Sequence, residues 1–147
     1  MTIFEILKLK TPESFAACLD KNFQYDKNHF VTKKANKMPC RNLDHLFKTK
    51  KYICTESANF ARIWLTKNGY WNQILYFRNK ENKNKHHFVC SFKYPGNDNL
   101  YVLGNSRAPG EIQGAFKSYK EIPTKIMPDL EFIKPVPVSS IFIIPEK

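Results

Sequence analysis

The sequence has no long hydrophobic run and no detectable targeting segment. No stretch of about 18 apolar residues occurs among its 147 residues, which excludes a membrane-spanning helix. The first ten residues contain neither a basic segment nor a small-residue cleavage site, so we expect no secretory signal and a cytoplasmic location. No internal repeat or linker divides the chain, and roughly 150 residues is a usual domain length. We therefore predict a single domain over residues 1–147.

Closely spaced cysteine pairs are also absent. The four cysteines form no CxxC motif, and without a secretory signal we expect them to be reduced rather than paired in disulfides. Residues of the types that bind zinc are Cys40, His45, Cys54, His87 and Cys90. Their spacings match no zinc finger, knuckle or ribbon, so we predict no metal and no cofactor.

Arginine is scarce although the chain is basic, with 24 Lys and Arg against 13 Asp and Glu and a net charge of +11. The arginines are Arg41, Arg62, Arg78 and Arg107. Arginine provides the planar fork that reads bases and holds phosphates, whereas lysine is a strongly hydrated point charge. The lysines alternate with asparagines, as in residues 78–87, which is typical of a solvated loop. The charge therefore favours a solvated surface over an anionic partner.

Hydrophobic residues make up 42% of the chain and charged residues 25%, values typical of a folded globular domain. Thr11, Pro12 and Glu13 form a strong helix start, which predicts a helix to about Asn22. A second, short amphipathic helix is predicted over Arg41–Lys51. A turn is expected at residues 25–28 and a loop over residues 30–40.

The most informative helix is predicted over Thr55–Asn68, which contains no proline or glycine and is followed by a stop at Gly69. Helical spacing places one stripe on a buried face: Cys54, Ala58, Ala61 and Leu65. Cys54 stands at the N-terminus of this helix. Because the helix dipole and unpaired N–H groups stabilise a thiolate, we expect the Cys54 pKa to fall from about 8.5 toward 7 or below.

The rest of the chain is dominated by strand patterns. Strands are predicted over Tyr70–Arg78, His87–Tyr94, Leu100–Leu103, Leu130–Ile133 and Ser139–Ile144. Pro95–Asn99 provides a hairpin turn between two of them. Helices followed by antiparallel strands predict an α+β domain, with the Cys54 helix packed on the sheet.

Two adjacent histidines begin one predicted strand. Strand alternation places His86 with the apolar set Phe88, Cys90 and Phe92, and His87 with the more polar set Val89, Ser91 and Lys93. We favour His87 as a functional side chain, with His86 as the alternative. Asn105 follows the next predicted strand, and an asparagine amide there could orient an imidazole through a hydrogen bond. A helix-end thiol, a histidine and an asparagine are the parts of a thiol-enzyme triad.

These features resemble the transglutaminase-like group of the papain-like cysteine-enzyme fold. The resemblance covers residues 11 to about 108 through four segments: Thr11–Tyr25, Cys54–Gly69, His87–Gly96 and Tyr101–Asn105. It implies a nucleophile at Cys54, a base at His87 and an orienting residue at Asn105. The sequence departs from the group in having Tyr52 where a glycine often lies, two residues before the nucleophile, and Asn105 where aspartate is commoner.

The resemblance implies a thioester mechanism on amide bonds or side-chain carboxamides, and hence a peptidase, deamidase or transglutaminase. Hydrolysis of an amide in a protein or peptide substrate is favoured, and the lysine-rich segment Arg78–Lys85 suggests an acidic substrate as a hypothesis. The alternatives are a basic module that stacks single-stranded nucleic acid on strand aromatics, and a non-catalytic interaction protein on the same fold. Taken singly, Cys54 fits a buried structural cysteine, His87 a structural histidine and Asn105 a turn residue.

Overall fold

The computed structural model describes residues 2–27 and 37–145, and every structural statement below concerns these residues. Their helices are α1 (Ile3–Leu7), α2 (Pro12–Asn22), α3 (Leu43–Thr49), α4 (Cys54–Lys67), α5 (Glu121–Ile126) and the 3-10 turn η1 (Val138–Ser140). Their strands are β1 (Gln24–Tyr25), β2 (Met38–Cys40), β3 (Lys51–Tyr52), β4 (Asn72–Asn79), β5 (His86–Phe92), β6 (Leu100–Leu103), β7 (Gln113–Phe116), β8 (Leu130–Val136) and β9 (Ile141–Ile143). None of the described helices is long and apolar enough to span a bilayer.

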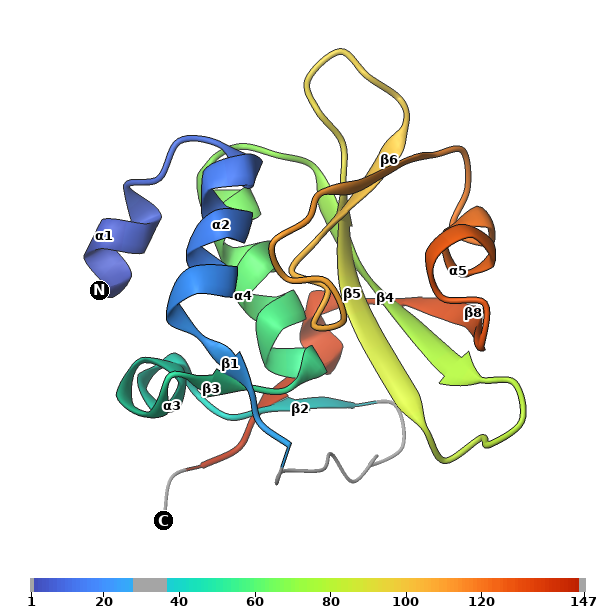
Figure 1. Ribbon diagram of the computed structural model, residues 1–147, viewed down its shortest axis with the longest axis horizontal. Helices are drawn as coiled ribbons and strands as arrows, with labels where there is room; N and C mark the ends of the chain where they lie inside the picture. The colour runs from blue at the N-terminus through green and yellow to red at the C-terminus, as the bar shows by residue number, and fades with distance from the viewer. Residues whose placement is uncertain (1, 28–36, 146–147) are drawn as a thin grey trace.

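Five strands form an antiparallel sheet in the order β7-β6-β5-β4-β8. Two small parallel pairs, β1 with β3 and β2 with β9, lie at the lower end of the molecule in Figure 1. β5 is the central strand, and β6 pairs with it only over Cys90–Phe92. The first residues of β5 are therefore paired with β4 alone, which leaves their other edge open to the helical layer.

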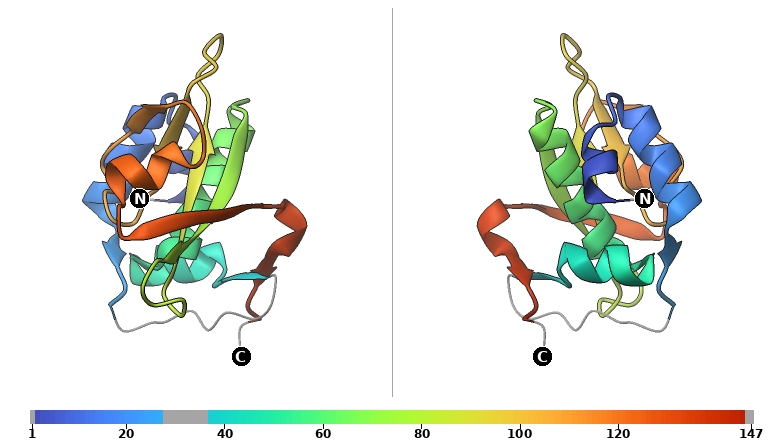
Figure 2. Two further views of the ribbon diagram at one scale, coloured as in Figure 1. Left: turned by 90° about the vertical axis from the view of Figure 1, so that its right-hand side faces the viewer. Right: turned by 90° about the vertical axis from the view of Figure 1, so that its left-hand side faces the viewer.

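The sheet has a helix on each face, as Figures 1 and 2 show. On one face α2 and α4 bury the large core, in which Phe15, Phe60 and Trp64 meet side chains of β4 and β5. On the other face α5 covers a smaller core that includes Val89 and Ile122. Burial of apolar area on both faces stabilises the sheet and fixes its register.

The predicted α+β architecture is confirmed, with α4 packed on an antiparallel sheet. The predicted helix starting at Thr11 is α2, and Thr11 caps it by accepting from the N–H of Ser14 at 3.1 Å. The alanines of the predicted stripe on α4, Ala58 and Ala61, have no exposed surface. Small side chains allow the helix to approach the sheet closely.

Several local predictions were wrong. Tyr25 is not part of a turn but pairs with Tyr52 in the β1–β3 ladder. The loop expected over residues 30–40 ends in strand β2, while residues 30–36 lie outside the described part. The side of β5 that carries His87 is not a polar face, because Val89 and Ser91 on that side are completely buried and Val89 belongs to the core covered by α5. Alternation alone does not reveal this second layer, since its helix is short and contains Pro123.

Candidate active site

Cys54 is the first residue of α4, and the helix begins without a side-chain cap. The N-cap position holds Ile53, whose side chain has no polar atom and therefore cannot accept from the N–H groups of the first turn. The backbone N–H groups of Cys54 and Thr55 instead lie against the Cys54 sulfur, and a third hydrogen bond comes from the N–H of Phe88. That N–H belongs to the peptide bond joining His87 to Phe88. The sulfur therefore contacts the backbone of the predicted histidine.

The pKa of the Cys54 thiol is raised to about 11, although the sequence predicted a lowered value. Burial is the largest cause, because a thiolate loses hydration there. The three backbone hydrogen bonds lower the pKa but do not outweigh burial, and the carboxylate of Glu56 raises the pKa further. The prediction considered only the helix end and not the strand that covers it. The resting side chain is thus a neutral thiol.

The residue at which β6 stops pairing with β5 determines which part of β5 other side chains can approach. β6 pairs with β5 as far as Leu103 opposite Cys90, and the chain then turns at Gly104 with φ of +73°. A Cβ at Gly104 would lie 2.7 Å from the Ser57 carbonyl oxygen and 2.8 Å from the Ala61 Cβ. Only glycine permits both this backbone conformation and this approach. The turn brings Asn105 next to β5 and sets α4 against it.

His87 and Asn105 are brought together by this turn. The His87 Nε2 and the Asn105 Oδ1 are 3.0 Å apart, and both residues are buried, at 5% and 1% exposure. The same Oδ1 accepts from the N–H of Arg107 at 3.0 Å, which identifies this amide atom as the oxygen. Nε2 must then carry the imidazole proton. Nδ1 is left as the basic nitrogen of the neutral ring.

The Asn105 amide is fixed at its other end as well. Its Nδ2 donates to Gln113 Oε1 at 2.8 Å and contacts the Met127 sulfur at 3.8 Å. Asn105 thus makes hydrogen bonds from both ends of its amide, so its orientation is determined by contacts to three other segments. Burial lowers the pKa of His87 to about 4, and the hydrogen bond to Asn105 partly opposes this shift. The ring is neutral at pH 7.

The two adjacent histidines have different partners. His86 is hydrogen-bonded through Nδ1 to the hydroxyl of Tyr76 on β4, on the face occupied by α4. His87 faces Asn105 instead. Among the described residues, no hydrogen bond joins the Cys54 sulfur directly to either imidazole. The predicted residues are therefore linked as one hydrogen-bonded pair, His87 with Asn105, and a thiol that contacts the peptide unit between His87 and Phe88.

An ion pair borders this group. Arg107 binds Asp129 through two hydrogen bonds of 2.8 and 2.9 Å, and both side chains are almost half exposed. The hydrogen bonds to Asp129 raise the pKa of Arg107, and burial raises the pKa of Tyr25. A negative charge on Cys54 adds to both shifts, so these three side chains lie within electrostatic reach of one another. Tyr25 is 46% exposed. The thiol is thus bordered by a tyrosine and a paired arginine at the surface.

Cys54 differs from the other cysteines in its exposure. Cys18, Cys40 and Cys90 are buried, whereas Cys54 is half-buried. Burial raises the pKa of Cys40 to about 12, and a buried apolar thiol is chemically inert. Within the described part of the chain, no three His, Cys, Asp or Glu side chains gather as metal ligands. Cys54 is the most accessible of the four cysteines.

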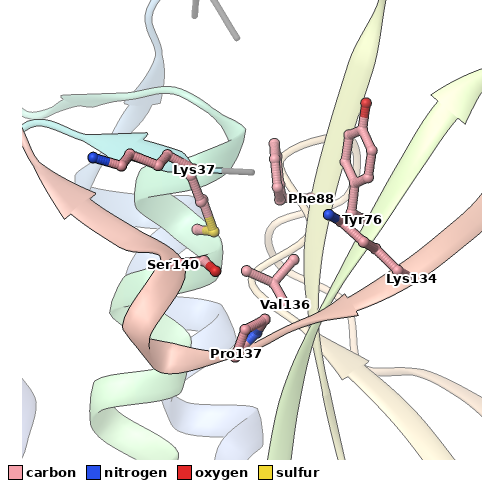
Figure 3. Close-up of a pocket in the computed structure, with 8 residues that line it drawn as sticks. Lys37, Tyr76, Phe88, Lys134, Val136, Pro137 and Ser140 are labelled. Atoms are coloured by element: carbon pink, nitrogen blue, oxygen red, sulfur yellow. The ribbon is translucent and has the colours of Figure 1, made fainter. Parts of the chain in front are cut away.

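A small pocket lies close to the site but does not include it. Figure 3 shows the rings of Tyr76 and Phe88 on its sheet side and Ser140 on the side of η1, with Val136 and Pro137 between them. None of the three predicted residues lines it. Phe88 separates the two sites, since its side chain borders the pocket and its N–H reaches the Cys54 sulfur.

Comparisons with known proteins identify a fold but no sequence family. No family model matches the chain, and no curated protein matches it. A solved structure of LapG from Legionella pneumophila has a TM-score of 0.57 and 15% identity, covering 91% of this chain and 70% of that one. The EGTA-treated LapG has a TM-score of 0.54 and 16% identity, covering 93% of this chain and 64% of that one. The fold is therefore LapG-like, that is, transglutaminase-like.

The site contains residues that the sequence analysis did not identify. Glu56 lies three residues after the N-cap, where an acidic side chain commonly reaches back to the N-cap N–H, and it could have been found. Arg107, Gln113 and Met127 meet Asn105 only through the tertiary fold. No local pattern marks them.

Proposed function

We propose that this chain is a thiol hydrolase of the transglutaminase-like cysteine protease class, with Cys54 as nucleophile, His87 as base and Asn105 as the orienting residue. The hydrogen bond between His87 Nε2 and Asn105 Oδ1 carries the proposal, because it leaves Nδ1 unprotonated. The LapG-like fold supports the same class. Peptidase chemistry on a protein or peptide substrate is the favoured form.

A neutral thiol and a neutral imidazole are a suitable resting pair for general-base catalysis. Charging either group alone is opposed by burial, which raises the pKa of Cys54 and lowers that of His87. Transfer of the proton from sulfur to Nδ1 creates two opposite charges that stabilise each other. We propose that this transfer accompanies attack on the substrate rather than preceding it.

The proposed reaction then has two stages. The Cys54 sulfur forms a bond to the amide carbon, the C–N bond breaks, and protonated His87 gives its proton to the departing amine. Water next attacks the thioester and gives a proton to His87. The C–S bond then breaks, His87 returns this proton to the Cys54 sulfur, and a carboxylic acid is released. The backbone N–H groups of Cys54 and Thr55, which lie against the sulfur in the resting site, are candidate donors to the oxyanion, each worth about 3 kcal/mol.

The competing nucleic-acid function is less favoured by the burial of the strand aromatics. Phe88 and Phe92 lie in the core beneath α4, so a base cannot stack on them. The remaining alternative is the same fold without catalysis. An acidic substrate stays a hypothesis, based on Lys80, Lys83 and Lys85 in the loop before β5. Replacing these lysines with glutamate should slow turnover of acidic peptides and leave neutral ones unchanged.

An electrophilic thiol probe tests the proposed function. We expect iodoacetamide at pH 7.5 to modify Cys54 first, as located by peptide mass spectrometry. His87→Ala should slow that modification and abolish cleavage of a fluorogenic peptide-amide library, because the base is lost. His86→Ala is the matched control: it removes a neighbouring imidazole on the opposite face and should leave both readouts close to those of the parent.

Two results would contradict the proposal. Equal, slow labelling of all four cysteines would indicate a structural Cys54. Selective labelling of Cys54 that is equally insensitive to His87→Ala and His86→Ala, with no cleavage of any peptide, would indicate a non-catalytic protein. A steep salt dependence of oligonucleotide affinity would favour the nucleic-acid function instead.

A further inference from the structure

A buried ion network lies beneath the first turn of α4. The Glu56 side chain is only 4% exposed, and its carboxylate accepts four hydrogen bonds. Oε2 accepts from the Arg41 backbone N–H at 2.9 Å and from Arg41 Nε at 2.7 Å. Oε1 accepts from Arg41 NH2 at 2.8 Å and from the Ile53 N–H at 2.9 Å. The carboxylate thus joins Arg41 to the residue immediately before Cys54.

Arg41 connects this turn to two further segments. Its NH1 donates to Asp26 Oδ2 at 3.0 Å, and the backbone N–H of Asp26 donates to the Tyr52 carbonyl at 2.7 Å. Arg41 itself directly follows β2, whose last residue, Cys40, contacts the Thr55 carbonyl through its sulfur at 3.5 Å. One guanidinium group therefore joins the segment that follows β1, through Asp26, to the first turn of α4, through Glu56.

Stability alone is a weak explanation for such a network. Burying an arginine and two carboxylates costs several kcal/mol of hydration per ion, and well-packed apolar residues often stabilise a protein equally well. A bidentate guanidinium fork does something that apolar packing cannot, because it fixes the direction of a carboxylate. Here that carboxylate in turn fixes the N–H of Ile53 and hence the start of the helix.

We propose that Arg41 is a positioning residue for the nucleophile: through Glu56 and Asp26 it fixes the first turn of α4, which presents the Cys54 sulfur. This role rests on the proposed function and extends it. The negative charge of Glu56 opposes formation of the thiolate two residues away, and the paired Arg41 offsets part of this charge. Position and charge are therefore controlled by the same side chain.

The charge effect is measured by the pH dependence of Cys54 alkylation. Arg41→Met leaves Glu56 unpaired, so the pH midpoint of alkylation should rise by about one unit, which corresponds to roughly tenfold slower reaction near neutral pH. Adding Glu56→Gln should return the midpoint to the parent value. Arg62→Met is the matched control, because Arg62 lies on the same helix and binds Asn59 instead; its midpoint should not move.

The positional effect is measured with Arg41→Lys, which keeps the positive charge but lacks the fork. We expect its alkylation midpoint to match the parent while kcat on a cleaved peptide falls at least tenfold with little change in KM. Far-UV circular dichroism and Tm establish that each variant is folded. If Arg41→Met does not fold, the Arg41→Met/Glu56→Gln and Arg41→Lys proteins carry the test.

The inference is overturned by a folded Arg41→Met protein with the parent midpoint, or by Arg41→Lys with the parent kcat. A midpoint shift that Glu56→Gln does not reverse would also overturn it. These readouts separate the two proposals. If no peptide is cleaved by the parent, the proposed function fails, and the alkylation midpoints still decide whether Arg41 acts on Cys54.

Discussion

The two ends of α4 are built in opposite ways. At the C-terminal end Gly69 has φ of +80°, its N–H binds the Thr66 carbonyl at 3.1 Å, and the Tyr70 N–H binds the Leu65 carbonyl at 2.9 Å. This is a complete Schellman motif, in which orphan carbonyls are satisfied locally. At the N-terminal end the cap residue is Ile53, and no side chain caps the first N–H groups.

The two ends of α4 therefore differ in role: the C-terminal end stabilises the helix, and the N-terminal end holds the candidate nucleophile. The C-terminal end follows the preferences of isolated helices, so its residues serve folding alone. The N-terminal end breaks those preferences, because its first N–H groups lie against the Cys54 sulfur, and Arg41 holds the turn by donating to Glu56. Violations of local rules concentrate where a site needs free donors. Substitutions at the two ends should therefore affect different measurements.

The largest effect is expected for Asn105→Ala, which changes the candidate site at the N-terminal end of α4. Without the Asn105 oxygen the His87 ring loses the acceptor that selects its tautomer, so kcat for peptide cleavage should fall about 10³-fold, or about 4 kcal/mol. Asn105→Asp should restore most of this loss, since it retains an acceptor for Nε2. Steady-state kinetics check both, and equal kcat in Asn105→Ala and the parent would contradict the assignment.

Gly104→Ala tests the contact between the β6 turn and the first two turns of α4. The new methyl group would lie 2.7 Å from the Ser57 carbonyl oxygen in a backbone conformation with positive φ. Overpacking and backbone strain together should cost about 3 kcal/mol in the free energy of unfolding. Urea denaturation measures this cost. Peptide cleavage should also fall under conditions where the variant is folded, because α4 and Asn105 are pushed apart.

The pH dependence of stability tests the burial of His87. Its pKa is about 4 in the folded protein and about 6.5 when unfolded, so the fold favours the neutral ring. The resulting stability is fully present above pH 6.5 and is lost as the pH falls toward 4, at about 1.4 kcal/mol per unit. We expect the parent to lose about 2 to 3 kcal/mol more than His87→Gln between pH 7 and 4.5. Parallel urea denaturation curves at both pH values provide the comparison, and equal losses would indicate an exposed or charged histidine.

The sequence predicted those elements whose signals are local. The start of α2 at Thr11 and Pro12, the stop of α4 at Gly69 and the pairing of β5 with β6 all follow from short-range propensity and turn chemistry. The β1–β3 pair was missed because a parallel ladder of two residues leaves no periodic pattern. β8 continues through Pro135, which is tolerated because β8 is an edge strand.

The sequence predicted the faces on which the candidate residues lie better than it predicted their pKa values and partners. Strand alternation placed His86 and His87 on opposite faces, and the structure gives them Tyr76 and Asn105 as separate partners. The predicted thiolate at Cys54 failed because desolvation depends on the strand covering the sulfur. The contact of Arg41 with Glu56 spans 15 residues and has no sequence periodicity. Desolvation and ion pairs of this kind arise only when segments that are distant in the sequence come into contact.

Gly69→Ala should give the smallest effect and sharpens the comparison between the helix ends. A methyl group at Gly69 would meet no atom within 4 Å, so the only cost is the positive φ, worth about 1 kcal/mol in the free energy of unfolding. Peptide cleavage and the alkylation midpoint of Cys54 should stay at parent values, since the change lies at the opposite end of α4. Gly104→Ala shares the same positive φ but adds the steric contact, so the difference between the two variants isolates packing from backbone strain. If Gly69→Ala slowed cleavage at full folding, the ends of α4 would be coupled along the helix, and the separation of structure from chemistry would be wrong.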